Sequence, residues 1–205
     1  MSKTIPMSRR ITPFQLIIMG FAGVILLGAL VLMLPLSARS GTVTPFGDAL
    51  FTATSAVCVT GLVVQDTASY WSGFGQTVIL LLIQIGGLGV ITVAASFALL
   101  SGRKISLMQR SAMQEAIAAP QMGGIVRLTG FILRMTLTIE VIGALVMLPV
   151  FCHDYGARGV WMAVFHSISA FCNAGFDLMG TKEAPYVSLM GYASHPLINV
   201  TIMLL

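Results

Sequence analysis

An uncharged stretch near the start of the chain most constrains what this molecule can fold into. Residues 14–34 provide 21 consecutive positions without a charged side chain. At about 1.5 Å per residue, a helix of this length crosses a hydrocarbon core of about 30 Å. Pro13 suits the first turn of such a helix, and Pro35 closes it. We therefore expect a first membrane-spanning helix over Phe14–Leu34.

Further apolar runs and the composition predict an all-α polytopic membrane protein. The runs cover Phe74–Leu100 and Leu128–Phe151, and a last one begins near Pro196. Only 9% of the residues are charged and the mean hydropathy is +0.94, whereas a soluble domain has about 25% charged residues. The last run, Leu197–Leu205, has nine residues, roughly half a crossing, so we expect the last span to be truncated.

One fourteen-residue motif occurs twice, at residues 49–62 and 163–176, with a constant offset of 114 residues. Six positions are identical in the two copies: Ala49/Ala163, Phe51/Phe165, Ser55/Ser169, Ala56/Ala170, Cys58/Cys172 and Gly61/Gly175. Two copies of one motif predict two copies of one local structure, each lying between spanning helices.

Each copy predicts a short helix that ends at a segment of small residues. We expect the first helix to run to about Val57 after an N-cap at Thr44 and a proline at its first position, and the second to cover Val160–Phe171. About 12 residues are too few to span, so a re-entrant segment is favoured. An amphipathic helix at the interface is the alternative, but it would carry a basic face that these segments lack.

The two loops after these helices are the candidate ion-binding residues. They comprise Cys58, Val59, Thr60 and Gly61 in the first copy, and Cys172, Asn173, Ala174 and Gly175 in the second. Their glycines allow conformations that turn successive carbonyls toward one axis, and rings of carbonyls replace the hydration shell of an alkali cation. The negative end of each preceding helix favours a cation as well. The loops contain no strong acid, base or nucleophile, so no enzyme and no bound cofactor is predicted.

The placement of basic residues predicts the orientation. Seven precede the first span or lie between the second and third, and three lie on the opposite side: Lys3, Arg9, Arg10, Arg103, Lys104, Arg110 and Arg127 against Arg39, Arg158 and Lys182. The positive-inside rule then places the N-terminus in the cytoplasm. The outer side carries an acidic excess that would attract cations: Asp48, Asp66, Asp154, Asp177 and Glu183. Basic residues form no patch with aromatics, so no nucleic-acid partner is predicted.

The expected organisation is a cytoplasmic N-terminus (1–13), a first helix–pore-loop–helix repeat (14–100), a cytoplasmic connector (101–127) and a second, truncated repeat (128–205). About one and three-quarters such units are then present. Both repeats have the same orientation, unlike the inverted repeats of many carriers.

The repeated Ser-Ala-x-Cys-x-x-Gly loops and the stretch Gln84–Val90 resemble the Trk/Ktr/HKT superfamily of potassium transporters. The short N-terminus is more similar to the Ktr membrane subunit than to Trk proteins. The resemblance implies four repeats around one pore, with a filter glycine in each, and Gly61 and Gly175 match two of them. It implies potassium selectivity, since serine replaces the first filter glycine in the sodium-selective branch.

The same resemblance implies a multi-pass protein of the bacterial inner membrane that carries potassium as its substrate. Coupling to sodium stays open. The implied partners are membrane lipid, a second copy of the complete subunit in a homodimer, and a cytoplasmic nucleotide-binding regulatory ring like KtrA. The alternative is a non-conducting membrane module or a solute carrier with parallel repeats.

Three further features have more than one interpretation. Gly86, Gly87 and Gly89 have the wrong spacing for a dinucleotide fingerprint, so close helix packing is favoured. The three cysteines, Cys58, Cys152 and Cys172, lack metal-ligand spacing and read as apolar filler. Glu140 lies near the midplane of its span, where either an ion pair or a pore-facing role would explain a carboxylate.

Overall fold

The computed structural model describes residues 12–90, 92–93, 107–116 and 124–205. Over these ranges the chain forms helices joined by loops, with no strand. The helices are α1 (Pro13–Leu32), α2 (Phe46–Val57), α3 (Gly73–Leu88), α5 (Leu107–Ala116), α6 (Ile125–Tyr155), α7 (Arg158–Phe171), the 3₁₀ helix η1 (Ser188–Tyr192) and α8 (Pro196–Leu204). The expected all-helical class is therefore confirmed for the described residues.

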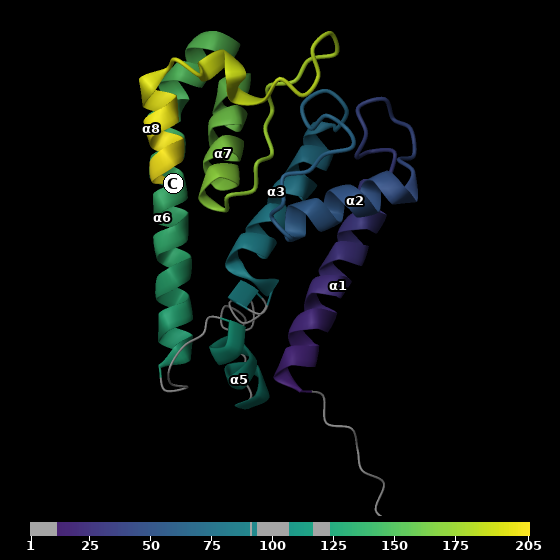
Figure 1. The fold of residues 1–205 in the computed structure, drawn as a ribbon, viewed down its shortest axis with the longest axis vertical. Coiled ribbons are helices and arrows are strands. Elements are labelled where there is room, and N and C mark those ends of the chain that lie inside the picture. The colour runs from purple at the N-terminus through teal and green to yellow at the C-terminus, as the bar shows by residue number, and fades with distance from the viewer. Residues whose placement is uncertain (1–11, 91, 94–106, 117–123) are drawn as a thin grey trace, which may run out of the picture.

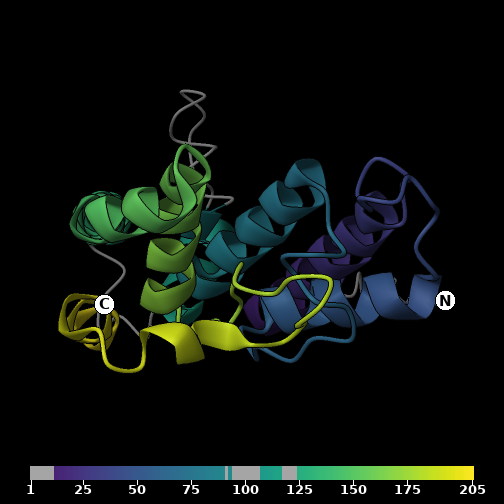
Figure 2. The same ribbon diagram turned by 90° about the horizontal axis from the view of Figure 1, so that it is seen from above.

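The helices form two groups that lie side by side (Figures 1 and 2). Helices α1, α2 and α3 contact one another, as do α6, α7 and α8. The groups meet where α3 contacts α7. In Figure 1, α7 descends beside the upper half of the long helix α6, while α2 crosses the upper end of α1.

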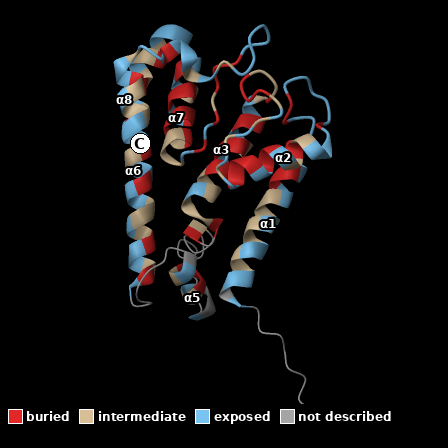
Figure 3. Cartoon of the chain, in the orientation of Figure 1, coloured by how far each residue is buried: buried red, intermediate tan, exposed pale blue. Residues whose placement is uncertain are grey.

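Helices α1 and α6 are long and apolar enough to cross a membrane, and α3 is a shorter apolar helix. Their surfaces distinguish them from core helices of a soluble protein. Only 17% of the most apolar window of α1 and 28% of that of α6 are buried. Figure 3 shows exposed positions along both helices, and these include Leu27 and Leu145, at 64% and 60% exposure. Surfaces of this kind suit contact with lipid.

The helix boundaries differ from the expected ones by a few residues, for local reasons. Helix α1 begins at Pro13 because the side chain of Thr12 caps it and Gln15 completes a capping box. Helix α2 begins at Phe46 with Pro45 as N-cap, so the expected cap at Thr44 is wrong. The Thr44 hydroxyl instead accepts a hydrogen bond from the phenol of Tyr70, 3.2 Å away.

The expectation of one uninterrupted second span over 74–100 is wrong at Gly89. Helix α3 ends at Leu88, and Gly89 takes φ +82° and ψ +132°. Such a conformation suits glycine, because it has no Cβ to clash. Val90 and residues 92–93 are helical again, and the rest of the predicted run lies outside the described residues. The predicted connector contains a helix, α5, which contacts α1 and α6.

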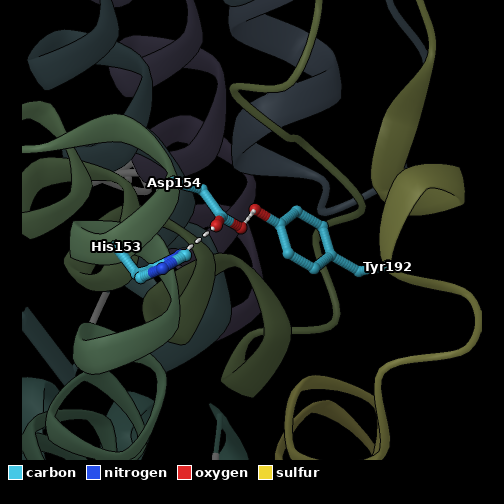
Figure 4. Close-up of polar contacts among 3 residues, drawn as sticks. All are labelled: His153, Asp154 and Tyr192. Carbon is cyan, nitrogen blue, oxygen red and sulfur yellow. Dashed lines mark hydrogen bonds and ion pairs between the residues drawn. The ribbon is translucent and has the colours of Figure 1, made fainter.

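A polar network fixes the segment between α7 and α8 against the end of α6 (Figure 4). The Tyr192 hydroxyl donates to Oδ2 of Asp154 at 2.6 Å, and Oδ1 of the same carboxylate lies 2.8 Å from Nδ1 of His153. Burial raises the pKa of Tyr192, and the bond to Asp154 raises it further. Tyr192 therefore stays a neutral donor and holds η1 in place.

Candidate functional site

The first predicted loop closes helix α2 in a Schellman arrangement. The N–H of Val59 donates to the carbonyl of Ala56 at 3.3 Å, and the N–H of Thr60 donates to that of Ser55 at 2.9 Å. This pair of bonds ends a helix when the residue after the C-cap turns left-handed. Val59 does so, with φ +57°.

The second predicted loop closes helix α7 with the same pair of bonds. The N–H of Asn173 donates to the carbonyl of Ala170 at 2.8 Å, and that of Ala174 donates to Ser169 at 2.7 Å. Asn173 has φ +55°, matching Val59. The two loops, residues 58–61 and 172–175, therefore share one backbone geometry, and we call them the first and second glycine loops.

Each glycine loop contains two left-handed residues, separated by one residue. Gly61 and Gly175 have φ of +74° and +72°, as their residue type allows. Val59 is different, because a β-branched residue rarely adopts this region. Such outliers persist where the surrounding structure enforces them, and they cluster at functional sites. The sequence predicted that the carbonyl of Val59 binds the ion. It did not predict the left-handed backbone at this position, because a valine gives no sign of such a turn.

The structure brings the two glycine loops into direct contact. A Cβ added to Gly61 would lie 2.7 Å from the carbonyl oxygen of Ala174 and 3.2 Å from Cα of Gly175. A Cβ added to Gly175 would lie 3.3 Å from Cα of Gly61. The backbones therefore meet at the two glycines, 114 residues apart in the sequence. A side chain at Gly61 would overlap the second loop, and one at Gly175 would be crowded by the first.

Two adjacent glycines of α3 form the support beneath the loops. A Cβ at Gly86 would overlap the carbonyl of Val57, the last residue of α2. A Cβ at Gly87 would lie 2.5 Å from Sγ of Cys172, the first residue of the second loop. The packing interpretation is therefore confirmed for Gly86 and Gly87, and one turn of α3 touches the ends of both short helices. It is wrong for Gly89, which ends α3 and where an added Cβ would meet only Thr92 Oγ1, at 3.8 Å.

Serine hydroxyls at equivalent positions of the two short helices bind their own loops. Ser55 Oγ accepts a hydrogen bond from the hydroxyl of Thr60 at 2.9 Å. Ser169 Oγ donates to the carbonyl of Phe176 at 2.6 Å. Both serines are buried, and each stabilises the fold of one loop.

His166 positions the chain that follows the second loop through contacts of both its ring nitrogens. It is 2% exposed, and its Nδ1 lies 2.7 Å from the carbonyl of Met162. Its Nε2 lies 3.2 Å from the backbone nitrogen of Leu178, which donates to it. The ring therefore ties the chain after Gly175 to α7. The equivalent Thr52 is also buried, and its hydroxyl has no partner among the described residues.

Glu140 is explained by a hydrogen bond between the two helix groups. Its side chain is 4% exposed, and Oε1 accepts from Nε2 of Gln84 on α3 at 2.8 Å. Its backbone carbonyl accepts from the hydroxyl of Ser167 at 2.6 Å. Within the described residues Glu140 has no ion pair, so it joins α6 to α3 and α7 through neutral groups.

Acidic residues predicted on the outer side are not equally free to attract cations. Asp66 is only 6% exposed and is fully engaged in hydrogen bonds. Asp48 accepts from the amide of Gln65 at 3.0 Å. Burial raises the pKa of Asp177, and the nearby Asp66 carboxylate adds to the effect. The expectation of an open acidic mouth is therefore wrong for Asp66.

A cavity of about 190 Å³ with both polar and apolar walls adjoins the second glycine loop. This volume is enough for several water molecules. It places water-accessible space next to the backbone of the loop. Its walls come from α7, the loop, η1 and α8: His166, Ser169, Ala170, Asn173, Gly175, Phe176, Asp177, Ser188, Leu189 and Ile202.

The chemistry available at this site is that of backbone carbonyls and hydroxyls. Among the described residues, no three His, Cys, Asp or Glu side chains are grouped as metal ligands. The three cysteines are free thiols. Oxygen donors arranged on two matching loops suit a hard monovalent cation better than a transition metal.

Comparison with known proteins agrees with this chemistry. The TrkH family, described as cation transport proteins, matches residues 4–205. The potassium/sodium uptake protein NtpJ of Enterococcus hirae is 47% identical over 173 residues, which cover 84% of this chain and 38% of that protein. The Ktr system potassium uptake protein B of Bacillus subtilis is 43% identical over 199 residues, covering 96% and 42%.

The protein of the same name from Vibrio alginolyticus is 37% identical over 189 residues, covering 92% of this chain and 40% of that protein. This chain thus spans about two-fifths of the length of these relatives. The resemblance to the Trk/Ktr superfamily is confirmed, and the members of that family named here are cation transport proteins. The chain is a member of the TrkH family of cation transport proteins.

Proposed function

We propose that this chain forms part of a potassium-conducting pore, in which the two glycine loops supply two of the filter segments. The single observation that carries the proposal is the matched geometry of the loops. Both have left-handed residues at their second and fourth positions, and they touch at Gly61 and Gly175. Irregular backbone at membrane depth is tolerated where it lines a cavity for water or ions.

Selection of the cation then rests on backbone carbonyls of Cys58–Gly61 and Cys172–Gly175. Carbonyl oxygens replace the hydration shell of the ion. The C-terminal ends of α2 and α7 add the negative end of a helix dipole next to each loop. Each loop is pinned by its Schellman bonds and a serine hydroxyl, so its carbonyls are held in place before an ion arrives.

We propose the complete assembly from the resemblance to the Ktr membrane subunit and from the placement of basic residues. The protein that contains this chain forms a homodimer in the bacterial inner membrane, with its N-terminus in the cytoplasm. A KtrA-like nucleotide-binding ring gates it from the cytoplasmic side. The name of the Enterococcus relative includes sodium as well as potassium, so we propose that sodium is the ion to test for coupling.

Potassium uptake tests the function directly. We expect the complete protein, produced with its regulatory partner in cells that lack other potassium systems, to restore growth at low external potassium. Uptake of rubidium, measured against increasing sodium, would give the selectivity. Purified protein that binds no potassium and moves none in proteoliposomes would contradict the proposal and favour a non-conducting module.

The proposed topology predicts which side of the membrane reaches two exposed positions. In a background without native cysteines, we expect a cysteine at Glu183 to react with an impermeant thiol reagent added outside whole cells. A cysteine at Arg110 on α5 should react only after the cells are opened. Both residues are exposed, whereas the buried Asp66 would make a poor label site. The reverse labelling pattern would invert the orientation.

A further inference from the structure

The carboxylate of Asp66 joins the two outer connections that follow the glycine loops. Its Oδ2 accepts hydrogen bonds from the backbone N–H of Ser69 at 2.8 Å and from the Ser69 hydroxyl at 2.6 Å. Its Oδ1 accepts from the backbone N–H of Tyr186 at 3.0 Å, 120 residues further along the chain. Both oxygens are therefore used, one within each half of the chain.

The second connection is built to receive this carboxylate. A Cβ at Gly180 would overlap both oxygens of Asp66. Only glycine at position 180 therefore lets these two segments of the chain approach so closely. Tyr186 has φ +61°, and its hydroxyl donates to the carbonyl of Val64 at 2.9 Å. We call Asp66, Ser69, Gly180 and Tyr186 the outer clasp.

The outer clasp lies a short distance along the chain from both glycine loops. Asp66 lies five positions after Gly61, and Gly180 lies five positions after Gly175. The loops also touch directly at Gly61 and Gly175. Each loop is thus held at its helix end by Schellman bonds and at its outer end by the clasp. Loss of the clasp would free the outer ends of both loops together.

We propose that Asp66 is a positioning residue that fixes the two glycine loops relative to each other and thereby sets cation discrimination. This inference rests on the proposed function of the loops. Hydrogen bonds to a charged acceptor in a buried site are among the stronger ones. A buried carboxylate is costly unless its oxygens are satisfied, which fits the complete use of both oxygens here.

The test compares Asp66→Ala and Asp66→Asn with Glu183→Gln, which removes an exposed carboxylate on the same outer side. We expect Asp66→Ala to lower the preference for potassium over sodium in rubidium uptake by about tenfold. Asp66→Asn keeps a carbonyl acceptor and should be intermediate, while Glu183→Gln should match the wild type. Wild-type discrimination in Asp66→Ala, with normal protein levels, would overturn the proposal.

Amide hydrogen exchange separates the clasp from the transport function and covers a variant that conducts poorly. In purified Asp66→Asn we expect the amides of Tyr186 and Ala174 to exchange about tenfold faster or more, with α6 unchanged. If Ala174 stays as protected as in the wild type, Asp66 does not position the loop. If exchange changes as expected but the wild type moves no cation, the clasp stands and the proposed function fails.

Discussion

Replacing Gly61 with serine is expected to lower the preference for potassium over sodium by about tenfold or more in the complete protein. The left-handed conformation costs a non-glycine residue about 1–2 kcal/mol, and about 1.4 kcal/mol corresponds to a tenfold change. The new Cβ would also lie 2.7 Å from the carbonyl oxygen of Ala174. The serine side chain therefore strains the backbone of the first loop and also displaces the Ala174 carbonyl of the second.

A matched control separates backbone strain from the effect on the loops. Gly41 has nearly the same φ, +71°, but a Cβ there meets nothing within 4 Å. Gly41→Ser should cause a similar backbone strain but leave cation selectivity unchanged. Gly175→Ser should resemble Gly61→Ser with a smaller steric part, because its nearest contact is 3.3 Å. Competition between rubidium and sodium in uptake assays measures all three variants.

Equal selectivity in Gly61→Ser, Gly175→Ser and the wild type would remove both glycine loops from the filter. If only Gly41→Ser changed selectivity, the loop between α1 and α2 that contains Gly41 would contribute to cation selection in place of the glycine loops. If Gly61→Ser is lost from the membrane, selectivity should be measured in Gly61→Ala instead, because alanine adds the Cβ without the hydroxyl.

Sequence reasoning predicted the short helices because their signals are local. The proline before the first short helix, and the small residues that follow Val57 and Phe171, each lie within or next to one element. The repeat then doubled the evidence. Helix α2 ends at Val57 as expected, and α7 ends at Phe171 while beginning two residues before the expected start.

The parts that sequence reasoning missed depend on contacts between distant residues. The valine type at Val59 gives no sign of a left-handed turn, because tertiary packing imposes that turn. Asp66 looked like a free acidic residue, since its partner Tyr186 lies 120 residues away. Glu140 left two explanations open for the same reason, because Gln84 belongs to another helix.

The helix break at Gly89 was missed for a different reason. A long apolar run with several glycines is compatible with both a continuous span and an interrupted one, because glycine is tolerated in spanning helices. Hydropathy measures the preference for lipid and says nothing of the backbone angles. The structure decides it through φ +82° at Gly89.

Replacing Gly86 with alanine is expected to destabilise the folded protein by about 1–3 kcal/mol, as overpacking does in other cores. The added Cβ overlaps the backbone carbonyl of Val57, and a backbone atom cannot turn aside. Gly87→Ala should cost less, because its contacts are the Cys172 thiol at 2.5 Å, which can rotate, and Cβ of Cys172 at 2.9 Å, rather than a backbone carbonyl. Thermal unfolding in detergent would measure both.

The control variant, Gly130→Ala, is expected to make the protein more stable rather than less. Gly130 on α6 has nothing within 4 Å of an added Cβ. Alanine in an open helix position is about 0.5–1 kcal/mol more stable than glycine, so Gly130→Ala should raise the unfolding temperature while Gly86→Ala lowers it. If Gly86→Ala also raised the unfolding temperature, α3 would not support the end of α2, and the position of the first glycine loop would need another cause. If it lowered the temperature and cation discrimination together, the same contact would hold the fold and the loop.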